Sequence, residues 1–170
     1  MKRLTTILSF LALLVLLTAS PGILGAHQNA DLPTDSQGVG GGPIAGGVPL
    51  AATDSTLWLR KGVFEPGGYV GIHHHPGALV VFVESGSLYY IVLEGEVIVY
   101  RQPMAETPGP TETYGPGDEF SLEAGDAWFE QGVVHVTENR GTEDAIVWLA
   151  ALATTDEPLT ILHEEGTPSH

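Results

Sequence analysis

The stretch Pro66-Gly67-Gly68-Tyr69-Val70-Gly71-Ile72-His73-His74-His75-Pro76-Gly77 places three histidines at the end of a run of strand-forming residues between two turns. On an extended strand, side chains at i and i+2 point to the same face, so His73 and His75 share one face. Another histidine, His135, lies in a later apolar segment. Neutral imidazole is the commonest transition-metal ligand, so the pattern predicts a metal site if folding brings His135 to that face.

Short apolar segments separated by turns continue on both sides of this stretch. They are rich in Val, Ile, Tyr, Phe and Trp and are bounded by Gly and Pro. Helical periodicity is confined to the first residues of the chain, so the pattern predicts an all-β sandwich or barrel. The predicted strands are 57–64, 69–75, 78–84, 87–93, 96–101, 119–122, 127–130, 133–139 and 145–153, with a proline-rich loop over 102–113.

The ends of the chain differ in composition from this β-rich region. Residues 1–26 begin with two basic residues and continue as an uncharged apolar stretch, which is typical of a signal peptide cleaved after Ala26. An uncleaved membrane anchor is the alternative. Residues 27–50 are rich in Gly and Pro and are expected to be flexible. The β-barrel domain is then expected over 51–156 and a polar C-terminal tail over 157–170.

Composition limits the partners of the protein. There is no cysteine, so disulfides and thiolate metal sites are excluded and any metal needs nitrogen and oxygen ligands. The formal net charge is -15, which repels phosphate backbones and argues against nucleic-acid binding and against docking to anionic lipid. With the signal peptide removed, we expect a secreted or periplasmic protein that is not attached to a membrane.

Two histidine motifs resemble those of the cupin superfamily. The first family motif is Gly, five residues, His-x-His, three or four residues, Glu, six residues and Gly. The second begins with Gly and ends in Gly-x-x-His-x-x-x-Asn, and here it is one residue short, with Gln131 where proline is usual. The matching positions are Gly67, His73 to His75 and Gly86 for the first motif, and Gly125, Gly132, His135 and Asn139 for the second. The β-rich region also looks like small exported single-domain cupins.

The resemblance implies a double-stranded β-helix, a jelly-roll-like barrel, with His73, His75 and His135 as ligands of a divalent transition metal. His74 should point the opposite way. The carboxylate ligand of metal-binding cupins falls on Leu79 here, so three neutral nitrogens would shift the preference from Mn²⁺ toward Zn²⁺, Fe²⁺ or Cu²⁺. Some cupins have lost the metal, so an empty structural barrel stays an alternative.

The sequence leaves the reaction open. One hypothesis is a metal-dependent enzyme on a small molecule, of the oxygenase, isomerase or lyase type. The alternative is a non-catalytic module that binds a metal or a small ligand. Glu130 and Gln131 are interpreted either as a solvated rim or as a nearby oxygen ligand or acid–base group. The resemblance also implies pairing into homodimers through an edge strand, such as 57–64 or 145–153, or through the N-terminal segment.

Overall fold

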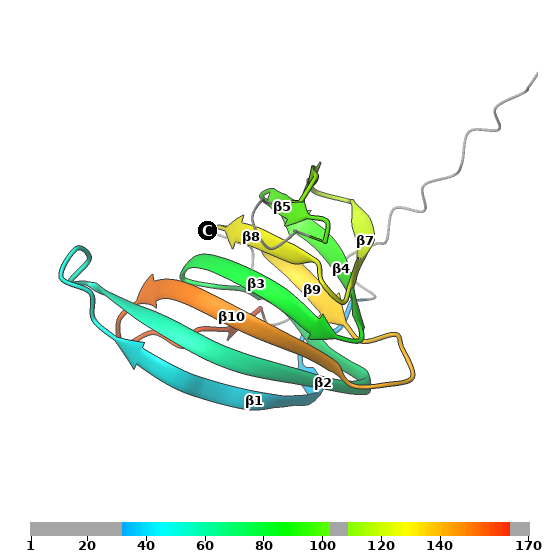
Figure 1. Cartoon of the computed structure of the whole chain (residues 1–170), viewed down its shortest axis with the longest axis horizontal. Coiled ribbons are helices and arrows are strands. Elements are labelled where there is room, and N and C mark those ends of the chain that lie inside the picture. Colours follow the sequence, from blue (N-terminus) through cyan, green and yellow to red (C-terminus); the bar gives the residue numbers. More distant parts are fainter. Residues whose placement is uncertain (1–31, 103–108, 164–170) are drawn as a thin grey trace, which may run out of the picture.

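The structure, a computed structural model, describes residues 32–102 and 109–163, which form an antiparallel β-barrel without a helix (Figure 1). The predicted signal peptide, 1–26, lies outside these residues. The strands are β1 (Ser36–Gly47), β2 (Ser55–His74), β3 (Gly77–Ser85), β4 (Ser87–Glu94), β5 (Val97–Tyr100), β6 (Thr111–Tyr114), β7 (Glu119–Glu123), β8 (Ala127–Gln131), β9 (Val134–Glu138), β10 (Ala145–Thr154) and β11 (Ile161–Leu162). Within the described ranges no helix has the length and hydrophobicity needed to cross a membrane.

The long strand β2 belongs to both halves of the barrel. Its first half pairs with β10, and its second half, after the turn at Gly67, pairs with β9. Gly67 has a φ of 76°, which glycine adopts without a steric penalty. One half of the barrel therefore has the order β2-β10-β3-β8 and the other the order β2-β9-β4-β7. This is the strand order of a two-sheet jelly roll, so the predicted double-stranded β-helix is confirmed.

The core fills the space between the two halves. In β3, Leu79, Val81 and Val83 are buried while Val80 and Phe82 are exposed, which is the period-two pattern of a strand with one face inward. Leu79, Val81 and Val83 thus form an apolar stripe on the inner face of β3. Apolar side chains from β4, β5, β7 and β10 complete the core, among them Leu88, Val97, Leu122 and Val147.

Three short stretches expected to be irregular form strands instead. Residues 36–47, inside the segment expected to be flexible, form β1, which pairs with β2 from Gly47 opposite Leu57 to Ser36 opposite Val70. Backbone hydrogen bonds to β2 order this Gly-rich strand, although it contributes few apolar side chains. A register irregularity follows Pro43, which is tolerated because β1 is an edge strand. β6 forms in the predicted loop 102–113, and β11 forms in the predicted polar tail.

The two apolar strands expected to offer edges for a dimer have neighbours on both sides within the chain. The first half of β2 lies between β1 and β10, and β10 lies between β2 and β3. Neither therefore presents a free edge to a second molecule. A homodimer stays a prediction, and its interface would have to involve another surface.

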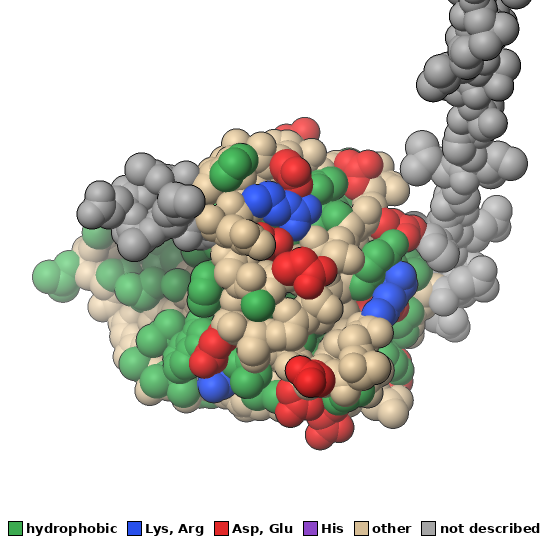
Figure 2. Space-filling view, turned by 45° about the vertical axis from the view of Figure 1, so that its right-hand side comes forward, with side chains coloured by type: hydrophobic (Ala, Val, Ile, Leu, Met, Phe, Trp, Pro, Cys, Tyr) green, Lys and Arg blue, Asp and Glu red, His purple; other side chains and the backbone are tan. Residues whose placement is uncertain are grey.

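Charged side chains are spread over the surface. Figure 2 shows acidic groups distributed across one face with a few basic groups beside them. Several of the basic groups form ion pairs: Lys61 with Glu84 at 3.5 Å, Arg101 with Asp126 at 2.9 Å and Arg140 with Glu138 at 2.6 Å.

Candidate metal centre

Three histidines converge inside the barrel. His73 lies on β2 directly opposite His135 on β9, and His75 follows the end of β2. One ring nitrogen from each of the three lies within 4.8 Å of the others. The ring centroids of His73 and His135 are 4.0 Å apart, and those of His73 and His75 are 4.9 Å apart. The structure therefore brings together the three side chains that the sequence selected as metal ligands.

Hydrogen bonds orient two of the rings. Nδ1 of His73 donates to the carbonyl of Gly71 and Nδ1 of His75 donates to the carbonyl of Leu159, both at 2.7 Å. A carbonyl only accepts, so the proton of each neutral ring lies on Nδ1 and the lone pair on Nε2 is free. This second hydrogen bond of a histidine is the usual way in which a protein orients a metal ligand.

The third ring, His135, has a buried nitrogen without a hydrogen bond. Its Nδ1 finds no acceptor or donor in residues 32–102 and 109–163. The nearby carbonyl of Val133 raises its pKa somewhat but does not reach hydrogen-bond geometry. A buried polar atom left unpaired is unfavourable, so the donor set fits a bound cation better than an empty barrel.

Burial keeps two of these imidazoles neutral. Removal from water lowers the pKa of His73 and of His135 well below 6.5, and the neighbouring histidines lower it further. The side chain of His73 is 3% exposed and that of His135 is 2% exposed. Both rings therefore have unprotonated nitrogens at neutral pH, which is the state that binds a metal ion.

The remaining histidines lie outside this group. His74 points away from it, as expected for the residue between two inward side chains, and its Nδ1 lies 2.7 Å from Nε2 of His163. His163, in the segment 157–170 that the sequence assigns to a polar tail, is partly buried, and its backbone N–H donates to the carbonyl of Ile72. His27 and His170 fall outside the described residues.

No protein-family model and no curated protein matches this chain. Solved structures do resemble it. An oxalate decarboxylase from Lactobacillus farciminis is 17% identical over 73% of this chain and 30% of its own, with a TM-score of 0.45. The DMSP lyase DddQ from Ruegeria pomeroyi is 17% identical over 69% of this chain and 47% of its own, with a TM-score of 0.40. A salicylate 1,2-dioxygenase from Pseudoaminobacter salicylatoxidans is 14% identical over 55% and 20%, with a TM-score of 0.37.

The chain thus spans less than half of the length of each of these structures. The fold assignment rests on the chain's own strand order, in which the two halves share β2. The chain has a cupin fold.

A carboxylate that the sequence left ambiguous lies beside the three histidines. Glu130 on β8 is 3% exposed, so the interpretation of this residue as a solvated rim is wrong. One of its oxygens, Oε1, is 3.3 Å from Nε2 of His75. The other, Oε2, accepts hydrogen bonds from the hydroxyl of Tyr90 at 2.6 Å and from Nε1 of Trp128 at 2.9 Å. The adjacent Gln131 is exposed.

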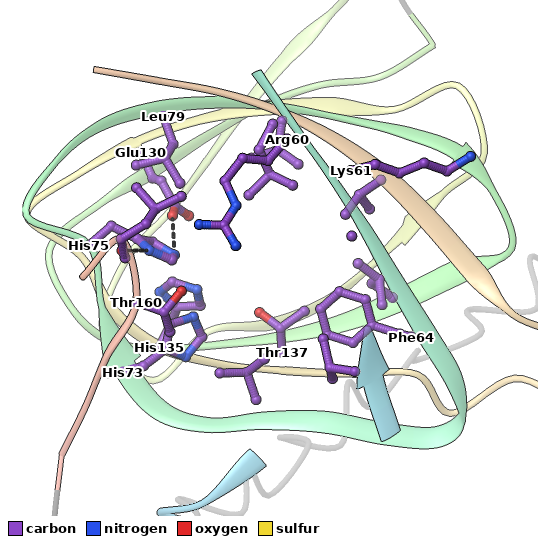
Figure 3. Close-up of a pocket in the computed structure, with 18 of the residues that line it drawn as sticks. Arg60, Lys61, Phe64, His73, His75, Leu79, Glu130, His135, Thr137 and Thr160 are labelled. Carbon is purple, nitrogen blue, oxygen red and sulfur yellow. Dashed lines mark hydrogen bonds and ion pairs between the residues drawn. The ribbon is translucent and has the colours of Figure 1, made fainter. Parts of the chain in front are cut away.

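A cavity of about 120 Å³ adjoins this group of side chains. Its walls are largely apolar and include Leu79, Val81 and Val147. Figure 3 shows the three histidines and Glu130 at one end of the cavity, with the guanidinium of Arg60 directed toward them. An apolar cavity with a few convergent polar groups is typical of a small-molecule site.

Proposed function

We propose that this protein is a metal-binding cupin in which His73, His75 and His135 hold one divalent transition ion beside a cavity for a small molecule. The observation that carries the proposal is the convergence of three ring nitrogens within 4.8 Å in the barrel interior. Nitrogen ligands of this kind suit Zn²⁺, Fe²⁺ and Cu²⁺, and also Mn²⁺ when a carboxylate is added.

A bound ion would act as a Lewis acid, polarising an oxygen of the substrate or activating water or dioxygen. The chain's own contribution is to hold the rings of His73 and His75 in place through the carbonyls of Gly71 and Leu159. Three protein nitrogens leave coordination positions open, as in catalytic metal sites. The apolar walls at Leu79 and Val81 exclude water from the ligand. These features support an enzyme of the oxygenase, isomerase or lyase type.

The second candidate function is binding of a metal or small ligand without turnover. The observation in its favour is the apolar wall of Leu79, Val81, Val147 and Leu149, which suits holding a small apolar group. The two functions differ in one measurement. Turnover in a panel of small molecules by the metal-loaded protein supports the enzyme, whereas binding without any turnover supports the module.

We further propose that the protein works outside the cytoplasm. The support is the sequence of residues 1–26, with its basic start, apolar stretch and small residue at Ala26. Cell fractionation combined with N-terminal sequencing of the mature protein tests this, and a mature chain beginning at His27 is expected. Recovery of an unprocessed chain in the cytoplasm would contradict it.

The metal proposal is tested by elemental analysis of the purified full chain. We expect about one equivalent of a transition metal per chain, and loss of most of it in His75→Ala. His74→Ala is the matched control, because it removes the adjacent imidazole, which points away from the site. Trace metal in the native protein that cannot be raised by adding any of the four ions would defeat the proposal.

A further inference from the structure

We propose that Glu130, on β8, is the carboxylate ligand of this metal site. It takes the place of the carboxylate that is missing at position 79, where the chain has a leucine. The inference rests on the proposed metal-binding function and adds a fourth, charged ligand to it. It accounts for the leucine at position 79 without loss of the metal.

Register places Glu130 in the right position for this role. Leu79 on β3 and Glu130 on β8 are direct partners in the strand pairing. Side chains of directly paired residues stand on the same face with Cβ atoms about 5 Å apart. Both side chains line the cavity. A carboxylate at 130 can therefore reach the space that a carboxylate at 79 would occupy, from one strand further along the sheet.

The two oxygens of Glu130 have different environments. Oε2 is fixed by the donors of Tyr90 and Trp128, whose hydrogen bonds set the orientation of the whole group. Oε1 is left facing Nε2 of His75 at 3.3 Å. Two hydrogen bonds on one oxygen and a free second oxygen pointed at the histidines are what a protein commonly provides to orient a ligating carboxylate.

The contact between Glu130 and His75 needs a positive charge between its atoms. Nδ1 of His75 donates to Leu159, so Nε2 of the neutral ring carries a lone pair. A lone pair and a carboxylate oxygen repel each other at this distance. Glu130 has no Lys or Arg ion-pair partner in the part of the chain that the structure describes. A divalent ion bound by both atoms satisfies them together.

A carboxylate changes which ions the site prefers. Three imidazoles alone leave both charges of the ion uncompensated and suit the softer ions. Adding one carboxylate oxygen compensates one charge and brings Mn²⁺ and Fe²⁺ into range. The sequence-based expectation that Mn²⁺ is disfavoured therefore applies only if Glu130 does not bind.

The test is metal titration of the metal-depleted full chain and its variants, with Mn²⁺ by calorimetry and Co²⁺ by visible absorption. Glu130→Gln keeps the size of the side chain and its acceptor for Tyr90 and Trp128. We expect it to raise the Kd for Mn²⁺ at least tenfold, since even the loss of a group that only orients a ligand costs about 10–100-fold, and to change the Co²⁺ spectrum. Adding Leu79→Glu to Glu130→Gln is expected to restore both, because the two positions face the same space. Glu96→Gln, on the exposed surface, is the matched control for lost charge.

Glu130→Asp keeps the carboxylate but shortens its reach, and gives a second variant if Glu130→Gln unfolds early. An unchanged Kd and an unchanged Co²⁺ spectrum in a folded Glu130 variant would overturn the inference while leaving the three-histidine site standing. Failure of the unaltered protein to bind either ion would instead overturn the proposed function, and this inference with it.

A separate observation concerns the ligand of the cavity, and from it we infer that the ligand is a small carboxylate anchored by Arg60. In the first half of β2, Thr56 and Phe64 are buried while Leu57 and Leu59 are exposed. Arg60 therefore occupies an inward position in the period-two pattern. Figure 3 shows its guanidinium inside the cavity, whereas Lys61 points away.

Arg60 differs from the other cations of the described chain in having no ion pair. Lys61, Arg101 and Arg140 each contact a carboxylate within 4.0 Å. An inward, partly buried guanidinium is costly unless an anion pairs with it. A protein with a net charge of -15 does not lack acidic side chains for this purpose, so leaving Arg60 unpaired in the cavity reserves it for a ligand.

Size and shape narrow the class of anion. The guanidinium is planar and binds a carboxylate through two parallel hydrogen bonds. A cavity of about 120 Å³ is somewhat smaller than one that takes benzene, at about 150 Å³. Its apolar walls suit a short hydrocarbon remainder. A monocarboxylate with few carbon atoms fits all three features, and one of its oxygens would face the proposed ion.

The experiment titrates Zn²⁺-loaded protein with butyrate, with butyramide as its neutral counterpart and with inorganic phosphate, following binding by saturation-transfer NMR. We expect butyrate to bind at least tenfold more tightly than butyramide, and Arg60→Gln to weaken butyrate at least tenfold. Arg60→Lys should recover part of the affinity. Lys61→Gln is the matched control, with the same loss of charge on the adjacent, outward residue.

Three results would overturn this second inference: equal binding of butyrate and butyramide, no effect of Arg60→Gln, or no binding of any probe. Tighter, Arg60-dependent binding of phosphate would overturn the carboxylate assignment in favour of an inorganic oxyanion. The metal content of Arg60→Gln is measured on the same samples and is expected to equal that of the unaltered protein. Loss of metal from all samples would point instead to failure of the proposed function.

Discussion

Lowering the pH from 7 to 5.5 is expected to destabilise the metal-free protein through His73 and His135. Both side chains are buried, and burial lowers the pKa of each well below 6.5 in the folded state. In the unfolded chain each returns to about 6.5. The unfolded state therefore binds more protons than the folded state below pH 6.5, so the free energy of unfolding falls as the pH falls. The stability that these two neutral rings contribute is fully present above the unfolded-state pKa, and it is lost as the pH falls toward the folded-state pKa.

The magnitude follows from the number of buried rings. With an unfolded pKa of about 6.5, each ring that stays neutral in the folded state contributes a loss of about 1.2 kcal/mol between pH 7 and pH 5.5. His73 and His135 are both almost fully removed from solvent, so the free-energy contribution of each ring is not reduced by solvent screening. Together they predict a loss of about 2.5 kcal/mol, a large fraction of the stability of an ordinary domain of about 5–15 kcal/mol.

Urea unfolding at several pH values, in the presence of a chelator, measures this loss. His73→Asn and His135→Asn should each remove about 1.2 kcal/mol of the loss between pH 7 and pH 5.5, whatever they do to the absolute stability. His74→Asn is the comparison variant, because His74 lies outside the group of three and is less buried; burial and His163 lower its pKa, so its loss should remove a smaller part. A flat pH profile in the unaltered protein, or the same slope in both Asn variants as in the unaltered protein, would refute the reasoning.

Three further outcomes are expected from the structure. Asn139→Ala should lower the free energy of unfolding by about 2–4 kcal/mol, because the buried amide donates to two backbone carbonyls and accepts from the N–H of Gly141; urea unfolding measures it, and a loss below about 0.5 kcal/mol would be inconsistent. Gly86→Ala should lower the melting temperature more than Gly117→Ala, because Gly86 has a φ of 72° and a Cβ there would lie 2.7 Å from Cα of Ala145, whereas a Cβ at Gly117 would meet open space; equal melting temperatures would contradict this. Zn²⁺ at one hundred times its Kd should stabilise the protein by about 2.7 kcal/mol, reversibly with chelator, and His75→Ala should abolish the effect; stabilisation that survives in His75→Ala would argue against the site.

The architecture was accessible from the sequence because turns and alternation mark most of its strands. Leu79, Val81 and Val83 alternate with exposed residues, and the structure confirms that pattern. β1 could not be found this way. Its sequence, Ser36–Gly47, is half glycine, and it is ordered by backbone pairing with β2 rather than by its own side chains. Such pairing depends on where the partner strand lies, which composition does not report.

The histidines and the carboxylate of the site also differ in how far the sequence could predict their positions. Positions 73 and 75 share a face by local geometry alone, so their proximity follows from the strand period. The proximity of Glu130 to His75 depends on the register between β3 and β8, which the sequence leaves open. A signal was nevertheless present, since Glu130 alternates with the exposed Gln131 and shares the inward face with Trp128. Arg60 carries the same period-two signal, because it shares one face of β2 with the buried Thr56 and Phe64.

The last part of the chain that the structure describes does more than end the domain. Leu159 is buried, its carbonyl holds His75, and Leu159 and Thr160 both line the cavity, although the sequence assigned them to a tail. Truncating the chain after β10 would thus remove part of the cavity wall, together with the carbonyl that accepts the hydrogen bond of His75. Affinity tags and fusion partners attached after His170 would be close in sequence to Leu159 and Thr160. Ligand binding should therefore be compared with that of a protein that carries the tag at its N-terminus.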